Sequence, residues 1–378
     1  MKLLMITGLG SARDLASGKK GAFYNMLEDF SKYWDRIDII VPRITNYELL
    51  ITNLFGNVYV HISPWPLIFH PLWFLKKGLE IYKEQKFDLM TVQDFPPFYN
   101  GIGARFLWNK IHVPYVLEFH HISGYPKAAN FKEKIYANKI VWKLYWKFFG
   151  SKAKAVRVVN QKQTPEFLKK IGVPTNKIEY ISSMYIDQNV FKPTNLQKIY
   201  DLIFVGRLEA NKGINILIDA MAKLINDKLM ANIKLLVVGD GSLVNELKLK
   251  TKNYKLEINC KFYGRAKDSN EIAELMNKSK VLVMSSYNEG GPRVVLEAMA
   301  CGVPVLATNV GLMPDFADKN AVKIIDWNSE DIANKAKELL ENENERKRLA
   351  TAGLEIAGQF EKKAMIKNYA DNLKQLIS

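Results

Sequence analysis

Two glutamates, Glu289 and Glu297, stand eight positions apart around a Gly-Gly-Pro turn at residues 290–292. Proline suits the first turn of a helix and Gly302 suits a helix end, so the sequence predicts a short helix between them. At a rise of about 1.5 Å per residue, Glu297 lies only about 8 Å along the axis from the start of that helix. The glycines let the backbone approach a ligand, and the helix start offers unpaired N–H groups. Because carboxylates accept paired hydrogen bonds from sugar diols, the motif predicts hydroxyl recognition, although either glutamate alone could be an ordinary surface acid.

Two cations precede this motif in the stretch VGRLEANKG, residues 205–213. Arg207 and Lys212 flank a turn between a strand and a helix that begins near Gly213. Backbone N–H groups, the positive end of the helix and both cations can converge there, which is how a diphosphate is held without a metal ion. Taken alone, the pair could equally be two surface cations on a loop.

The elements that must position these residues alternate between strands and helices. In the first half, the pattern predicts strands at 2–7, 38–41, 58–62, 89–92, 115–119 and 155–159, and helices at 22–34, 71–85, 97–109, 131–149 and 163–171. In the second half, it predicts strands at 201–208, 233–241, 258–263, 281–286, 303–309 and 322–325, and helices at 214–226, 242–251, 268–278, 292–300 and 330–341. Continuously apolar strands alternating with helices indicate parallel sheets that are covered on both faces.

This pattern predicts an α/β protein with two doubly wound, Rossmann-like domains that face an interdomain cleft. We expect a first domain at residues 1–192, a second at 193–360, and a C-terminal helix at 361–378 that packs back on the first domain. Ligands of such sheets bind outside the carboxyl ends of the strands, and the motifs above follow strands directly.

Length and composition indicate a globular protein without disulfide bonds or membrane-spanning segments. A chain of 378 residues, 48% of them apolar, is long enough for two ordinary cores. Only two cysteines occur, so we expect no disulfide framework and a reducing, cytoplasmic compartment. The apolar N-terminus reads as a first strand rather than a signal peptide, and no apolar run approaches the ~20 residues of a membrane span.

The net charge of +15 is concentrated in residues 105–170, which contain 14 Lys/Arg and 3 Asp/Glu, a net charge of +11. In the helix at 131–149, lysines recur at helical spacing and aromatic residues lie between them. Such a basic amphipathic helix predicts peripheral contact with an anionic membrane at its inner face, unless the aromatic residues face the core. Nucleic acid is not expected, because no recognised binding motif accompanies the charge. The expected membrane contacts are Lys139, Trp142, Lys143, Trp146 and Lys147.

The stretch NEGGPRVVLEAMACGVPVLATNVG, with VGRLEANKG upstream, resembles the signature of glycosyltransferase family 4, whose members have the GT-B fold. The family pattern of glutamate, seven residues, glutamate is met by Glu289 and Glu297, and its arginine–lysine pair by Arg207 and Lys212. The resemblance covers residues 200–345. It implies retaining transfer of a sugar from a UDP- or GDP-linked donor, with no cofactor and no metal ion.

The resemblance also implies roles for individual residues. Arg207 and Lys212 would neutralise the leaving diphosphate, Glu297 would bind the nucleotide ribose, and Glu289 would bind the donor sugar. Charge stabilisation on a leaving group acts on the rate as well as on binding. The expected catalytic residues are therefore Glu289, His120, Arg207 and Lys212, and the remaining donor-binding residues are Gly290, Gly291, Pro292, Arg293, Glu297, Gly264, Arg265 and Gly21.

The first half matches the family less closely. VPYVLEFHHISG resembles the family strand that ends in a histidine, which places His120 at the cleft and leaves His121 as the adjacent alternative. Gly21 is the nearest match to the glycines that follow the family's first strand. Met184 and Tyr185 replace an Asn-Gly pair that the family often shows.

Other functions fit the sequence less well. GLGSAR at residues 8–13 has Arg13 where a dinucleotide fingerprint needs glycine. A hydrolase needs two carboxylates that flank a bond, which Glu289 and Glu297 on one turn-helix unit do not suit. We therefore expect a glycosyltransferase of the hexosyltransferase type that acts on a glycan or lipid-linked acceptor. The alternatives are a non-catalytic nucleotide-sugar-binding protein and a GT-B sugar-nucleotide epimerase.

Overall fold

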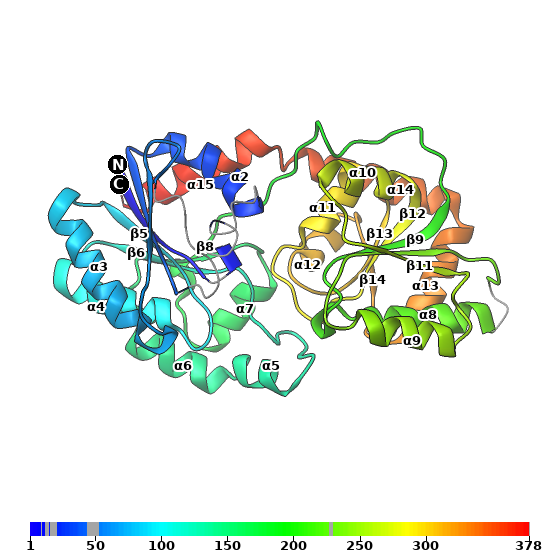
Figure 1. Ribbon diagram of the computed structural model, residues 1–378, viewed down its shortest axis with the longest axis horizontal. Helices are drawn as coiled ribbons and strands as arrows, with labels where there is room; N and C mark the ends of the chain where they lie inside the picture. Colours follow the sequence, from blue (N-terminus) through cyan, green and yellow to red (C-terminus); the bar gives the residue numbers. More distant parts are fainter. Residues whose placement is uncertain (9, 12–14, 16–20, 44–52, 227–229, 378) are drawn as a thin grey trace.

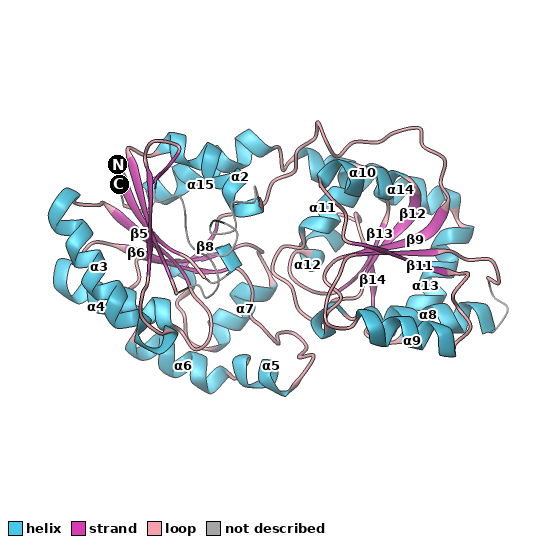
Figure 2. Ribbon diagram, viewed as in Figure 1, coloured by secondary structure: helices cyan, strands magenta, loops and turns pink. Residues whose placement is uncertain are grey.

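The computed structural model describes residues 1–8, 10–11, 15, 21–43, 53–226 and 230–377. Two parallel α/β units lie side by side, and both chain ends lie in the first unit (Figure 1). Helices flank each sheet on both sides, as Figure 2 shows. The predicted fold class, two Rossmann-like domains, is confirmed.

The first sheet has eight strands in the order β3-β4-β2-β1-β5-β6-β7-β8, all parallel except β3. Helices α3, α4, α6 and α7 cover one face, and α2 covers the other. The strands are β1 (Lys2–Ile6), β2 (Arg36–Val41), β3 (Asn53–Leu54), β4 (Val58–Ile62), β5 (Leu89–Gln93), β6 (Tyr115–Phe119), β7 (Ala155–Val158) and β8 (Ile178–Tyr180). The helices are α2 (Ala22–Phe30), α3 (His70–Gln85), α4 (Tyr99–Ile111), α5 (Phe131–Tyr136), α6 (Lys139–Phe148) and α7 (Gln163–Lys170).

The second sheet has six parallel strands in the order β11-β10-β9-β12-β13-β14. Helices α8, α9 and α13 pack on one face, and α10, α11, α12 and α14 on the other. The strands are β9 (Tyr200–Val205), β10 (Leu235–Val238), β11 (Cys260–Gly264), β12 (Ser279–Met284), β13 (Val305–Thr308) and β14 (Lys323–Ile325). The helices are α8 (Ile214–Asn226), α9 (Val244–Asn253), α10 (Ser269–Asn277), α11 (Arg293–Ala300), α12 (Met313–Ala317), α13 (Ser329–Glu341) and α14 (Glu343–Gly358).

The last helix, α15 (Lys362–Gln375), returns from the second unit to the first and lies beside α2 (Figure 1). Its apolar face joins the core under β1, β2 and α2, with Ile366, Tyr369 and Leu373 buried there. The chain therefore crosses between the units twice, once before β9 and once before α15.

The helix predicted over 131–149 is two helices. The first helix ends at Tyr136, and Asn138 caps the second, because its side-chain oxygen accepts a hydrogen bond from the Ile140 N–H at 2.9 Å. Asparagine at such a position competes with the continuous helix by bonding the backbone itself. Strands β3 and β8 and helices α12 and α14 were not predicted. Short edge strands and helices with weak apolar periodicity leave little signal in a sequence.

Candidate active site

A cavity of about 260 Å³ opens between the two units at the carboxyl ends of their strands. His120 follows β6 in the first unit, and it faces Arg207 and Lys212, which follow β9 in the second. Glu289 lines the same cavity from the loop after β12. His121 also lines the cavity. The structure thus brings together all four residues that the sequence selected as catalytic.

Lys212 and Glu289 form an ion pair across this cavity. The side chains are 20% and 15% exposed, and the Ser286 hydroxyl donates a second hydrogen bond to the same glutamate oxygen at 2.8 Å. The sequence assigned Lys212 to a diphosphate and Glu289 to a sugar. In this structure each is instead the partner of the other, because a half-buried carboxylate needs a compensating charge.

The two glycines of the motif bring the units together. A Cβ added to Gly290 would lie 1.7 Å from the His120 carbonyl oxygen, and one added to Gly291 would lie 1.9 Å from the Met184 sulfur. The Asn160 amide also donates to the Gly290 carbonyl at 3.4 Å. The sequence predicted that these glycines admit a ligand. In this structure, their missing side chains admit the backbone of the first unit and the side chain of Met184.

A larger hollow of about 700 Å³ adjoins the first one, and Arg207 lines both. Gly21, the residue before α2, faces Arg265, Asp240 and Arg293 across this hollow. Three arginines and three acids line it, so its wall carries charges of both signs: Arg207, Arg265, Arg293, Glu209, Asp240 and Asp268. Gly264 is not among the residues that line it. Its φ of +85° instead allows the turn after β11, and its carbonyl accepts from the Gly239 N–H at 2.8 Å.

Glu297 lies at a third hollow of about 100 Å³, next to Arg293 and Asn25, which also line the large one. Pro292 is the N-cap of α11, so the helix begins where the sequence predicted and carries Glu297 into the interface. Burial raises the pKa of Glu297 to about 7, and Arg293 only partly offsets that rise. The Arg293 guanidinium lies 4.8 Å from the ring centroid of Tyr185. A carboxyl group with this pKa can respond to a ligand that donates hydrogen bonds to it.

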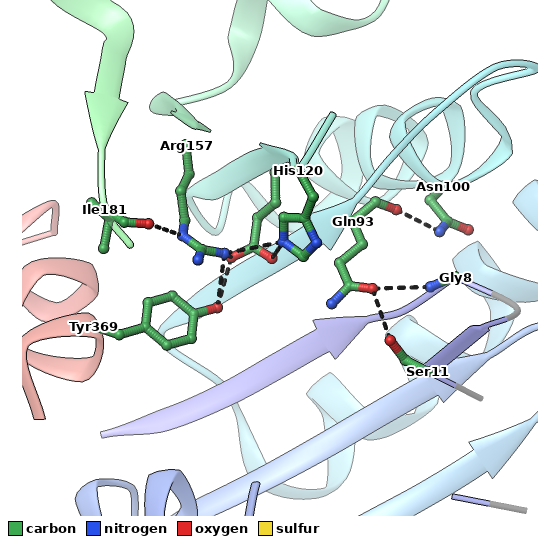
Figure 3. A network of polar contacts seen from close by, with 9 residues as sticks. Gly8, Ser11, Gln93, Asn100, His120, Arg157, Ile181 and Tyr369 are labelled. Carbon is green, nitrogen blue, oxygen red and sulfur yellow. Dashed lines mark hydrogen bonds and ion pairs between the residues drawn. The ribbon is translucent and has the colours of Figure 1, made fainter. Parts of the chain in front are cut away.

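A buried ion pair lies behind His120 and was not predicted (Figure 3). Glu118 and Arg157 stand opposite each other in register on β6 and β7, and each is 1% exposed. Arg157 Nη1 is 3.0 Å from Glu118 Oε1 and 3.3 Å from His120 Nε2. The signal in the sequence was one charged residue in each of two otherwise apolar strands, YVLEF and AVRV. Gln93, at the end of β5, was also missed, and it accepts hydrogen bonds from the Gly8 N–H and the Ser11 hydroxyl, each at 3.3 Å.

The predicted membrane contacts are corrected in part. Trp142 and Trp146 are 0% and 8% exposed and belong to the core of the first unit, so they cannot contact a membrane. Trp142 also donates its indole N–H to the Tyr136 carbonyl at 2.7 Å, which gives the buried polar group a partner. The three lysines are exposed. The solvent-facing side of α5 and α6 carries a different apolar set: Phe131, Ile135, Ile140, Val141, Leu144 and Phe148.

Among the described residues, no group of three or more His, Cys, Asp or Glu side chains could hold a metal ion. Within the same part of the chain, no helix has both the length and the apolar character needed to cross a bilayer.

This chain is similar to proteins that are named as glycosyltransferases. Residues 186–356 match the family model described as glycosyl transferases group 1. An uncharacterized glycosyltransferase of Methanocaldococcus jannaschii, MJ1178, is 26% identical over 343 residues, covering 86% of this chain and 87% of the relative. The Campylobacter jejuni enzyme GalNAc-alpha-(1->4)-GalNAc-alpha-(1->3)-diNAcBac-PP-undecaprenol alpha-1,4-N-acetyl-D-galactosaminyltransferase is 28% identical over 198 residues, 52% of each chain.

The crystal structure of Anabaena Alr3699/HepE in complex with UDP and glucose superposes on this chain with a TM-score of 0.74. The sequences are 20% identical, and the match covers 99% of this chain and 100% of the other, so it shows a shared fold. Together the relatives and the family model support a glycosyltransferase, and the chain has the GT-B fold.

Proposed function

We propose that the protein is a retaining glycosyltransferase of family 4, which transfers a sugar from a nucleotide-sugar donor without a bound metal ion. The observation that carries this proposal is the convergence of Arg207, Lys212, Glu289 and His120 on one interdomain cavity. A second support is the larger adjoining hollow, which shares Arg207 with this cavity. In this proposal the sugar binds in the cavity of about 260 Å³ and the nucleotide in the hollow of about 700 Å³. Arg207 lines both and would bind the diphosphate between them.

The ion pair between Lys212 and Glu289 suggests how the donor engages. A diphosphate carries more negative charge than one carboxylate and competes for Lys212. Once Lys212 turns to the phosphate, Glu289 is released to accept hydrogen bonds from sugar hydroxyls. As the bond between sugar and diphosphate breaks, charge develops on the leaving oxygen, and Arg207 with Lys212 stabilises it. This is transition-state stabilisation by fixed cations, so their loss lowers kcat.

The donor test is calorimetric titration of the protein with UDP-, GDP- and ADP-sugars. We expect one nucleotide to bind in the micromolar range and Glu297→Ala to weaken it by about 1–3 kcal/mol. Glu330→Ala, at an exposed site in the first turn of α13, is the matched control. If no donor binds, or if both variants bind as the wild type does, the assignment of this cleft is wrong.

Turnover separates an enzyme from a non-catalytic binder or an epimerase. With donor and acceptor extract, we expect release of the nucleoside diphosphate and a new glycosidic bond, whereas an epimerase would return an epimeric nucleotide-sugar and form no new glycosidic bond. Proton NMR of the first product tests the stereochemistry. The anomeric configuration of the donor should be kept, and an inverted anomer would exclude the retaining mechanism.

We also propose that the acceptor is lipid-linked and that the enzyme works at the inner face of the cell membrane. The α5–α6 surface, defined by the exposed residues Phe131, Ile135, Ile140, Leu144 and Phe148, combines apolar side chains with exposed lysines. Such a surface binds an anionic bilayer in two ways. Its apolar side chains insert into the interface, and its lysines are attracted to the anionic head groups. The Campylobacter relative is named for an undecaprenol-linked substrate, which supports the same acceptor class.

Sedimentation with vesicles tests the membrane proposal. We expect binding to vesicles rich in phosphatidylglycerol but not to phosphatidylcholine vesicles, and weaker binding at high salt. Leu144→Ser with Phe148→Ser should remove the binding. Leu249→Ser, on α9 of the second unit and 60% exposed, is the matched control and should bind as the wild type does. Equal binding by all three proteins would contradict a role for this surface.

A further inference from the structure

The ion pair behind His120 is held from several elements at once. Arg157 donates its Nε–H to the Ile181 carbonyl at 2.8 Å, in the segment that follows β8. Tyr369, from the C-terminal helix α15, donates its hydroxyl to Glu118 Oε1 at 2.8 Å. The Tyr369 ring centroid also lies 4.1 Å from the centre of the Arg157 guanidinium. Strands β6 and β7 and helix α15 therefore fix the pair in one geometry (Figure 3).

The pair stays ionised although it is buried. Burial opposes the ionisation of Glu118, but the positive charge of Arg157 beside it lowers the pKa of Glu118 to about 2. A rigid, neutralised pair of this kind presents a guanidinium N–H in a fixed direction.

That N–H points at the imidazole of His120. Arg157 Nη1 lies 3.3 Å from His120 Nε2 in hydrogen-bonding geometry. A guanidinium can only donate, so Nε2 must be the acceptor and the ring proton resides on Nδ1. Glu118 Oε2 is the competing neighbour at 3.5 Å, and a proton on Nε2 would give this otherwise unpaired oxygen a partner among the described residues. The contact from Arg157 is the shorter of the two, and on that distance we take Nε2 as the acceptor.

We propose that Glu118, Arg157 and Tyr369 are positioning residues that hold His120 as the Nδ1–H tautomer. His120 Nδ1 points away from Arg157 (Figure 3), and the His120 side chain, 42% exposed, lines the cleft. The imidazole then donates a hydrogen bond from Nδ1 to a substrate oxygen. This role rests on the proposed function for its substrate, whereas the tautomer is a property of the protein alone. The last helix of the chain thereby contributes to the setting of a cleft residue on the first sheet.

Nitrogen NMR of the 15N-histidine-labelled, ligand-free protein tests the tautomer directly. The His120 signals are assigned by their loss in His120→Asn. We expect a protonated Nδ1 and an unprotonated Nε2 in the wild type. In Arg157→Lys the single tautomer should give way to a mixture. In an assay of transfer, that variant should lose about tenfold in kcat, with the donor KM changed less than about twofold. Tyr369→Phe, which keeps the ring, should show a smaller change in the same direction.

A matched control exists in the same sheet. Arg36 pairs with the buried Asp38 at 2.9 Å, and Asp38 contacts His61 Nε2 at 2.8 Å. None of these three residues lines the site cavities. Arg36→Lys should therefore leave the His120 signals and kcat unchanged.

These experiments distinguish a failure of the positioning proposal from a failure of the proposed function. A wild-type proton on Nε2 overturns the proposal, as does an Arg157→Lys protein whose His120 signals and kcat match those of Arg36→Lys. If Arg157→Lys does not fold, the wild-type tautomer and the Tyr369→Phe spectrum decide. If the tautomer is as expected but no nucleotide-sugar is turned over, the failure belongs to the proposed function and not to the positioning network.

Discussion

The two glutamates of the motif, Glu289 and Glu297, differ in how their negative charge is stabilised. Glu289 has a cation and a hydroxyl as partners. Glu297 is partly buried next to Arg293, but desolvation outweighs the effect of that cation and raises the pKa of Glu297 to about 7. The two carboxylates of one motif therefore have different surroundings, because Glu289 is paired with a cation whereas Glu297 is mainly desolvated.

Because the pKa of Glu297 is raised, the stability of the protein should fall as the pH rises, and nucleotide binding should release a proton. The folded state binds this proton more tightly than an ordinary glutamate does, so its contribution to stability is largest below pH 4.5 and is lost as the pH rises through about 7. A ribose that donates hydrogen bonds to the carboxylate lowers that pKa. At pH 7 we expect release of about half a proton per nucleotide bound.

Calorimetry in buffers of different ionisation enthalpy measures that proton. Glu297→Gln should abolish the release. Asp94→Asn is the control, because burial raises the pKa of Asp94 to about 7 as well, but Asp94 lines neither of the two hollows that Arg293 lines. Unchanged proton release in Glu297→Gln would contradict a ribose contact at this residue.

Gly290 is a second residue with a sharp prediction. Gly290→Ala places a methyl group 1.7 Å from the His120 carbonyl oxygen, so α11 and β6 must move apart. We expect a loss of at least about tenfold in kcat/KM, because a misplacement near 1 Å in a site has effects of this size or larger. Gly358→Ala, at a position with nothing within 4 Å of the added carbon, should be active and slightly more stable. Equal activity of the two variants would argue against a constrained contact at Gly290.

At the scale of elements, α6 shows how one helix serves the core and the surface. Its tryptophans face the sheet, and its lysines alternate with an apolar outer row. A stripe pattern tells which residues share a face, but not which of two apolar faces is buried. That choice is made by the packing partners, here Phe98, Phe119 and Phe167 around Trp142.

Unfolding in denaturant separates the two faces of α6. Trp142→Ala should lower the free energy of unfolding by about 3–5 kcal/mol, since it removes a fully buried indole. Leu144→Ser, at a side chain 51% exposed, should change it by no more than about 0.5 kcal/mol. Similar losses in both variants would mean that the outer row is covered in the folded protein.

For the whole molecule, α15 ties the two units together. It follows the second unit in the chain, but its apolar side chains lie in the core of the first. Direct contacts between the units add to this tie. Gln163 donates to the Asn309 carbonyl at 3.2 Å and accepts from the Gly311 N–H at 2.7 Å.

The stability of the first unit should therefore depend on the far end of the chain. Leu373→Ala removes a side chain with 0% exposure, and we expect a loss of about 2–5 kcal/mol in the free energy of unfolding, reported by the tryptophans of the first unit. Leu354→Ala, on α14 and 38% exposed, serves as the control and should cost about 0.5 kcal/mol or less. Equal, small losses would show that α15 does not contribute to this core.

The fold class and most elements were predictable, because buried parallel strands and amphipathic helices leave periodic patterns. The strands at 58–62 and 115–119 and the helix at 214–226 were predicted with the bounds that the structure has. The edge strands β3 and β8 were not, since two or three half-exposed residues form no pattern. The positions of the motif residues were also predictable, because the strand pattern places them after β9 and β12, whereas their roles came from the family resemblance.

The sequence by itself determined two α/β units and the set of residues at the ends of their strands. Local periodicity and short-range spacing are properties of neighbouring residues, so they can be read along the chain. Tertiary structure alone decided that Lys212 pairs with Glu289, that Gly290 meets His120, and that Tyr369 supports Glu118. Each of those contacts joins residues dozens to hundreds of positions apart. Their distances depend on how the two units and the last helix pack, which no local pattern encodes.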